Sequence, residues 1–202
     1  MAMQKATITI VGKRPILFNA FTLDTISLER KEKTGVAGND PEEWKRSVLK
    51  TENNQLYLPA KYIFGCIREG GKYTPRGRST LLPKISATLE VLDEIILLDR
   101  YLSNDFSLET KGDVYIDVQG VKNPKTRGRN IRYRVATTKG WRTTFSIAWE
   151  STIIQKSEME AVLTDAGNFV GLGDGRSIGY GRFDVEKFET ENGTTSSKKK
   201  KL

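Results

Sequence analysis

The segment of residues 171–181, GLGDGRSIGYG, constrains the fold more than any other part of the chain, because five of its eleven residues are glycine. Glycine adopts positive φ angles at no steric cost and lets the backbone approach another chain closely. The segment lies between a predicted helix and a predicted strand, whereas the dinucleotide-binding glycine motif leads from a strand into a helix. Two interpretations stay open. Either successive amides form an anion-binding nest with Gly173, Gly175, Arg176 and Ser177, or the glycines only permit a tight packing turn.

Apolar and polar residues alternate in several short segments, which is the pattern of half-buried strands. The predicted strands are residues 6–11, 112–118, 130–135, 143–149 and 181–188. Two helices are predicted, one over residues 60–70 that Pro59 opens and one over residues 158–169. This order predicts an α+β fold with a ferredoxin-like βαββαβ core, the layout that RNA-recognition-motif domains use.

Other segments are predicted around this core from local turn and cap residues. Asp40 caps a short helix that starts at residues 40–44, and the pair Asn53-Asn54 turns a hairpin over residues 47–58. Residues 84–98 are rich in β-branched and Leu residues, which predicts one or two strands. Residues 138–140 are predicted to turn a hairpin that joins the two strands on either side.

The chain is long enough for one full-sized domain. We expect a single domain over residues 1–189, with loop or hairpin insertions near 22–58 and 100–142. Residues 190–202 are polar and end in a run of lysines, which predicts a disordered basic tail.

The formal net charge of +8 favours a polyanionic partner, since attraction to phosphate is long-ranged and independent of sequence. Residues 118–149 contain no Asp or Glu but eight cations, and Tyr133 and Trp141 lie among them as candidates for stacking on bases. Like charges without counter-ions are costly unless a polyanion neutralises them; the alternative is a basic surface hairpin without a ligand. The eight are Lys122, Lys125, Arg127, Arg129, Arg132, Arg134, Lys139 and Arg142. A smaller cluster follows the first helix: Arg68, Lys72, Arg76 and Arg78.

Catalytic residue types are scarce. The chain has no histidine, which excludes Ser–His and histidine-based acid–base catalysis, and it has no Cys/His spacing for zinc, so no cofactor is expected. Asp24 is the remaining candidate for metal-assisted strand scission, while Asp40 is better explained as a helix cap.

The single cysteine, Cys66, lies in an apolar stretch and fits a buried residue in a reducing cytoplasm. Neither a secretion signal nor a membrane-spanning segment is predicted.

Two motifs resemble the CRISPR-associated RAMP superfamily, RNA-binding proteins built from ferredoxin-like domains. Residues 171–181 match its C-terminal signature of glycine-hydrophobic-glycine pairs separated by five residues. Residues 56–68, LYLPAKYIFGCIR, resemble the proline-headed helix of its backbone subunits, with Pro59, Gly65 and Arg68 at matching spacing. The small and Ser positions after the proline differ, being Ala60, Lys61 and Tyr62 in this sequence.

The resemblance implies a guide-RNA-lining subunit that oligomerises along CRISPR RNA in an antiviral effector complex, with target nucleic acid and other effector subunits as further partners. Lys61, Arg68 and Lys72 would contact phosphates from the helix and Arg176 from the glycine loop, and residues 119–142 would form a protruding thumb or its neighbour. A loop Asp cleaves target RNA in type III complexes, which points to Asp24, although residues 17–21 lack the family's usual glycine-rich stretch.

Three alternatives to this role stay open. The family also contains guide-processing endoribonucleases, which often use a histidine. A stand-alone or virus-encoded homologue could mimic the backbone subunit to inhibit the complex. Outside the family, a general RNA- or ribosome-associated domain fits the composition as well.

Overall fold

The computed structural model describes residues 2–22, 39–122 and 127–191. Its strands are β1 (Met3–Gly12), β2 (Gln55–Pro59), β3 (Pro75–Arg76), β4 (Ser79–Thr80), β5 (Glu90–Val91), β6 (Ile95–Tyr101), β7 (Val114–Lys122), β8 (Arg129–Thr137), β9 (Arg142–Glu150) and β10 (Phe183–Thr190). Its helices are α1 (Glu43–Ser47), α2 (Ala60–Gly70), α3 (Leu82–Thr88) and α4 (Lys156–Asp165). A π-helical turn, η2 (Ala166–Val170), continues α4, and a 3₁₀ turn, η3 (Arg176–Ile178), lies in the glycine-rich segment.

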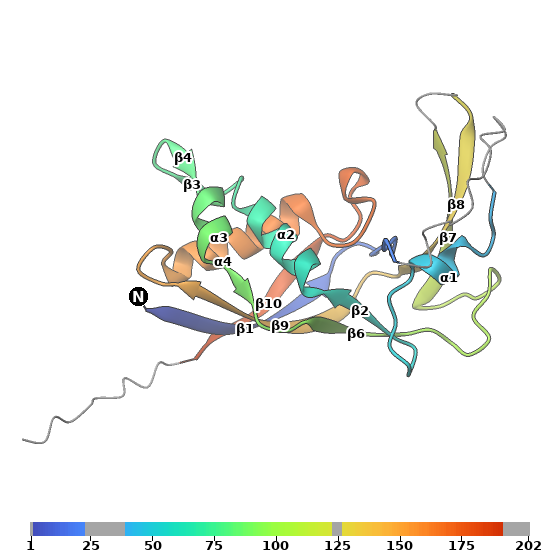
Figure 1. Ribbon diagram of the computed structural model, residues 1–202, viewed down its shortest axis with the longest axis horizontal. Coiled ribbons are helices and arrows are strands. Elements are labelled where there is room, and N and C mark those ends of the chain that lie inside the picture. Colours follow the sequence, from blue (N-terminus) through green and yellow to red (C-terminus); the bar gives the residue numbers. More distant parts are fainter. Residues whose placement is uncertain (1, 23–38, 123–126, 192–202) are drawn as a thin grey trace, which may run out of the picture.

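The central sheet has the strand order β10-β1-β9-β6-β2, with β5 pairing beside β6 on β9. Every pairing within it is antiparallel. Helices α2, α3 and α4 lie together over one face of this sheet (Figure 1). The predicted α+β class is therefore confirmed. None of the helices in the described ranges is long and apolar enough to cross a membrane.

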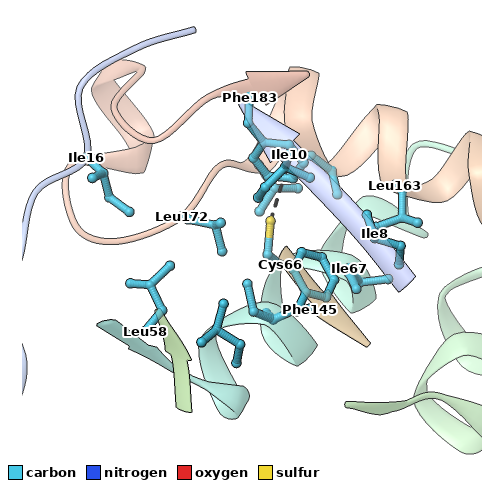
Figure 2. Packing of buried hydrophobic residues seen from close by; sticks show 14 of the residues in the cluster. Ile8, Ile10, Ile16, Leu58, Cys66, Ile67, Phe145, Leu163, Leu172 and Phe183 are labelled. Atoms are coloured by element: carbon cyan, nitrogen blue, oxygen red, sulfur yellow. Dashed lines mark hydrogen bonds between the residues drawn. The ribbon is translucent and has the colours of Figure 1, made fainter. Parts of the chain in front are cut away.

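The hydrophobic core lies between the sheet and these helices. The alternation in β1 sends Ala6, Ile8 and Ile10 inward, as the sequence pattern predicts, and leaves the threonines between them on the other face. Helix α2 buries Cys66 on its inner face, and the Cys66 Sγ lies 3.9 Å from the carbonyl oxygen of Ala166 (Figure 2). Burying a large aliphatic side chain, such as that of Ile8 or Ile10, contributes about 1.5–3 kcal/mol to folding.

A two-stranded hairpin of β7 and β8 projects away from the sheet and its helices (Figure 1). Its base is attached to the segment that follows β1: the amide of Phe18 donates to the Val135 carbonyl at 2.8 Å, and the amide of Thr137 donates to the Ile16 carbonyl at 3.0 Å. The hairpin therefore rises from the point where the first strand leaves the sheet.

The predicted hairpin turn at residues 138–140 is wrong. Strand β8 pairs with β7 along its whole length, whereas β9 pairs with β1. Residues just before β9 hydrogen-bond to the end of β1 instead: the amide of Gly140 donates to the Gly12 carbonyl at 2.7 Å, and the amide of Gly12 donates to the Trp141 carbonyl at 2.7 Å. The turn thus passes the chain from the hairpin into the central sheet.

Two further predictions can be compared with the structure. The strand prediction for residues 84–98 is correct for β5 and β6 but wrong for the start, which belongs to helix α3 and buries Ile85. Helix α1 begins at Glu43 with Glu42 as its N-cap residue, so the predicted cap at Asp40 is wrong by two residues. The Asp40 Oδ1 instead accepts a hydrogen bond from the amide of Glu42 at 3.1 Å, just before the helix. Strand β10 extends to Thr190, and residues 192–202 of the predicted tail lie outside the described residues.

Candidate nucleic-acid interface

The outer face of helix α2 carries Lys61, Gly65 and Arg68, which share one side because residues four and three apart align on a helix. Lys61 and Arg68 are exposed, while Cys66 and Ile67 are buried on the opposite face. A Cβ added to Gly65 would meet no atom within 4 Å. The middle of this helix face is therefore open, with a cation on either side.

The glycine-rich loop, residues 171–181, faces this side of α2. All five of its glycines have positive φ angles, between 67° and 92°. At Gly173 an added Cβ would lie 2.5 Å from the Leu17 carbonyl oxygen, and at Gly181 it would lie 1.8 Å from the Leu172 carbonyl oxygen. The packing interpretation thus holds for these two glycines: they let the loop close on itself and on the segment after β1.

The backbone amides in the middle of the loop, at residues 175–177, behave differently. No backbone carbonyl of the described residues accepts a hydrogen bond from the amides of Gly175, Arg176 or Ser177. Arg176 and Ser177 are exposed. The packing interpretation therefore holds for Gly173 and Gly181, and the anion-binding nest at residues 175–177 stays a prediction.

Two clefts separate α2 from the loop, with volumes of about 610 Å³ and 270 Å³. Gly65, Asp174 and Arg176 line both, so we treat them as one surface, the α2–loop groove. The larger cleft is also lined by Arg68, Glu69, Tyr73, Phe169, Val170, Gly175, Ser177 and Arg182. The smaller is also lined by Asn19, Lys61, Tyr62, Gly171, Leu172 and Gly173.

Arginine side chains dominate the electrostatics of the larger cleft. Arg176 forms no ion pair with any acid in the described part of the chain, and the Arg182 Nη1 has no hydrogen-bond partner there. Arg68 pairs with Glu69 at 2.9 Å, and Lys72 pairs with the same carboxylate. The hydrogen bond from Lys72, followed by that from Arg68, lowers the pKa of Glu69. The positive charge of the exposed Arg176 is thus left available to a ligand, whereas the Arg182 Nη1 is buried.

The smaller cleft is less basic. Burial, and then the negative charge of Asp174, raises the pKa of Tyr62, so its phenol stays protonated and can donate a hydrogen bond. The Asn19 side-chain amide donates to the Asp174 Oδ2 at 2.9 Å. Lys61 is the exposed cation at this end.

An ion pair between a buried arginine and a half-buried aspartate connects the groove to the base of the β7–β8 hairpin. Arg134 is 9% exposed and lies 3.1 Å from the Asp174 Oδ2. Asp117 stands opposite Arg134 in the ladder, and burial raises its pKa above the ordinary 3.8. The Gln119 side-chain amide also donates to the Tyr180 Oη at 3.0 Å. Arg134, predicted as an RNA contact, is placed here between the hairpin and the loop.

The premise that residues 118–149 lack counter-ions is wrong, because the fold brings acids to them from other segments. Arg132 pairs with Glu43 of α1, and Arg142 pairs with Glu186 of β10 at 2.7 Å. Trp141 is also unavailable for stacking on bases: it is fully buried, and its indole N–H donates to the Arg14 carbonyl at 2.9 Å. An acid-free stretch of sequence is therefore not an acid-free surface.

The remaining predicted cations lie away from the groove. Lys122, Arg127 and Arg129 are exposed on the outer part of the hairpin (Figure 1). Arg76 lies in β3, where it pairs with Glu158 at 3.2 Å, and Arg78 is exposed in the turn before β4. Lys125 and the catalytic candidate Asp24 lie outside the described residues.

The structure therefore brings a subset of the predicted site together. The predicted residues that line the groove are Lys61, Arg68, Gly173, Gly175, Arg176 and Ser177. The prediction missed Arg182, which directly follows the glycine signature, and it missed Asn19, Tyr73 and Phe169, which reach the site only through the fold. Across residues 2–22, 39–122 and 127–191, no three cysteine or acidic side chains are grouped so that they could hold a metal ion.

No protein-family model and no curated protein matches the chain. Among solved structures, it is similar to a chain in the "Cryo-EM structure of the Type III-B Cmr-beta bound to cognate target RNA", with a TM-score of 0.50 and 16% sequence identity. The similarity covers 93% of this chain and 60% of that chain, so the present chain spans less than two thirds of its neighbour's length. At this level of identity the match establishes a shared fold.

Proposed function

We propose that this protein is an RNA-binding subunit of a CRISPR effector ribonucleoprotein, and that the α2–loop groove holds the sugar-phosphate backbone of guide RNA. The observation that carries the proposal is the groove itself, which sets Lys61 and Arg68 of α2 opposite Arg176 and the loop amides from which no backbone carbonyl of the described residues accepts a hydrogen bond. Cations and backbone amides are the groups that bind phosphate without reading sequence. The structural neighbour, a chain in an RNA-bound Cmr complex, supports the same function.

The fold supports the proposal in a second way. We infer that the core is ferredoxin-like, because strand order β10-β1-β9-β6 and helices α2 and α4 follow the βαββαβ arrangement. The β7–β8 hairpin is an insertion in this core, and we propose that it serves as the thumb, with Lys122, Arg127 and Arg129 contacting nucleic acid. Lys125, predicted to contact RNA, lies outside the described residues and stays a prediction.

The proposed role includes further partners. A guide-lining subunit repeats along its RNA, so we propose that the protein binds other copies of itself and other effector subunits in the cytoplasm. Cleavage of target RNA at Asp24 stays a prediction, since that residue lies outside the described part of the chain.

Co-purification of RNA tests the function directly. The protein should be expressed with a CRISPR RNA, purified, and analysed for bound RNA by sequencing and for size by native mass spectrometry. We expect short RNA of repeat-derived sequence and a ladder of oligomers on it. The double variant R68A/R176A should be folded but free of RNA, while K187A, which removes an exposed cation of β10, should retain RNA. Wild-type protein that is folded, monomeric and free of RNA would refute the proposal.

A further inference from the structure

An exposed aromatic pair lies at one end of the larger cleft. The rings of Tyr73 and Phe169 are 5.1 Å apart between centroids and inclined by 41°. Their side chains are 53% and 51% exposed, although both are large enough to be favoured inside a core. Both line the same cleft as Arg68, Arg176 and Arg182. Paired, solvated rings beside several arginines are the features of a surface that binds nucleic-acid bases.

The fold holds these two rings in place. Phe169 belongs to η2, which buries Ala166 and Val170 and directs Phe169 outward. The end of α2 packs tightly on this turn: an added Cβ at Gly70 would lie 2.7 Å from the Ala166 Cβ. These contacts fix the distance between the two backbones that carry the rings, so that the pair is formed before a ligand arrives.

A hydrogen bond ties the two segments together just beyond the rings. The Thr74 hydroxyl donates to the Asp165 Oδ2 at 2.6 Å, and the amide of Tyr73 donates to the Gly70 carbonyl at 2.9 Å. Binding on a preformed surface loses less conformational entropy than binding that must order two side chains.

The cleft offers room for a base and cations for its phosphate. Its volume of about 610 Å³ is in the usual range for small-molecule sites. Two carboxylates also line it, but Lys72 holds Glu69 and Arg134 holds Asp174. Arg176 and Arg182 pair with no acid among the described residues, so the charge left in this lining is positive.

We propose that this cleft is a subsite for one unstacked nucleotide of single-stranded RNA, with the base stacked on the Tyr73–Phe169 pair and its phosphate bound by Arg68 and Arg176. The inference rests on the proposed function for the identity of the polymer as RNA. It specifies single-stranded RNA as the ligand of the groove, because contacts to the sugar-phosphate backbone alone would accept a stacked or paired strand equally well. A duplex keeps its bases inside the helix and offers none to the aromatic pair.

The experiment measures the affinity of short single-stranded RNA by fluorescence anisotropy, with an abasic residue placed at each position in turn. For wild-type protein, the abasic residue at the position that occupies the cleft should weaken binding about tenfold, the effect of losing one base–aromatic stack. Y73A and F169A should bind the intact RNA about tenfold more weakly and lose the abasic effect. Y73F should behave as wild type, because only the ring is required. The matched control is Y101A, which removes a ring that is 55% exposed on β6.

A second measurement uses wild-type protein and does not depend on the folding of variants. RNA with 2-aminopurine at the same position should change its fluorescence on binding as the base stacks on the rings, and a duplex of the same sequence should compete poorly. Equal affinity for intact and abasic RNA at every position would overturn the subsite. If R68A and R176A still weaken binding in that case, the backbone groove stands and only the base subsite is wrong.

Discussion

At the scale of single residues, Gly65 is the most informative position in the groove. It lies inside the 11-residue helix α2, where glycine costs about 1 kcal/mol relative to alanine. Packing does not require it, since an added Cβ would meet no atom within 4 Å. Because Gly65 lines both clefts, its missing side chain serves to keep the floor of the groove open.

Two substitutions of Gly65 should therefore separate stability from binding. G65A should raise the free energy of unfolding by about 0.5–1 kcal/mol, as measured by urea denaturation, because alanine favours the helix. G65F should leave the protein folded but weaken RNA binding, since its ring would fill the groove between Lys61 and Arg68. Wild-type affinity in folded G65F would show that RNA does not lie in the groove.

Cys66 provides a test of the packing beneath the groove. Burial raises the pKa of its thiol to about 12, so almost no reactive thiolate is present at neutral pH. We expect a thiol reagent to label the native protein at pH 8 only as fast as the protein unfolds, and to label it at once in denaturant. Because the chain has one cysteine, the signal has a single source. Immediate stoichiometric labelling of native protein would contradict the packing of α2 on the sheet.

At the scale of elements, the β7–β8 hairpin and the glycine-rich loop act as one unit. Arg134 of β8 reaches Asp174 of the loop, and the Gln119 side chain of β7 reaches Tyr180 at the end of the loop. Removing Asp174 would leave the buried charge of Arg134 without this partner, which costs more than the pair contributes. The hairpin thus helps to set the position of Arg176 without contacting it.

The pH dependence of stability reports on the base of this hairpin. Burial raises the native pKa of Asp117 above 3.8, so between 3.8 and the native pKa the native state binds more protons than the unfolded state. Stability therefore falls as pH rises through this window, and the loss is complete above the native pKa. D117N should melt at a higher temperature than wild type at pH 7, and the difference should disappear below pH 3.8.

The matched control for this experiment is D105N, which changes an exposed aspartate outside the hairpin. Its melting temperature should follow that of wild type at each pH. A lower melting temperature for D117N than for wild type at pH 7 would show that the ionised carboxylate stabilises the hairpin base, contrary to its burial.

The elements that sequence predicts correctly are those whose signal is local. The alternation in residues 6–11 and the proline at Pro59 are enough to place β1 and the start of α2. The sequence does not predict helix α3 because its β-branched and Leu content favours a strand, whereas its buried Ile85 and the flanking buried residues Leu81 and Leu89 follow helical spacing. The hairpin between β8 and β9 was wrongly predicted because the partner of each strand is decided by residues far away in the chain.

The candidate site divides in the same way. Arg68 and Arg176 belong to local motifs and were predicted, and the structure places both on one groove. Tyr73 and Phe169 carry no motif, and only the packing of α2 on η2 brings them together. The charges of residues 118–149 were misread because their acidic partners lie in α1, β10 and the loop.

At the scale of the whole molecule, predicted cations lie on the α2–loop groove and on the outer part of the hairpin. The hairpin projects away from the sheet and its helices (Figure 1). A strand of RNA that lies along the groove and then reaches the β7–β8 hairpin would contact both surfaces. Contacts of this kind are electrostatically independent when they are farther apart than a Debye length of about 8 Å at physiological salt.

The two surfaces should therefore contribute additively to the free energy of RNA binding. R129A in the hairpin and R176A in the loop should each weaken binding, and the double variant should lose the sum of the two within about 0.5 kcal/mol. Isothermal titration with one long single-stranded RNA provides the three values. A double variant no weaker than R176A alone would show that the hairpin is not part of the RNA-binding surface.

The central claim is that cations of the α2–loop groove neutralise RNA phosphates, and the salt dependence of binding tests it most directly. Each phosphate contact with a single strand contributes about 0.7 to the slope of log K against log salt concentration. R68A and R176A should each reduce the steepness of that slope by about this amount, with an unchanged melting temperature, while K187A should leave it as in wild type. Equal slopes for wild type, R68A and R176A would contradict the account.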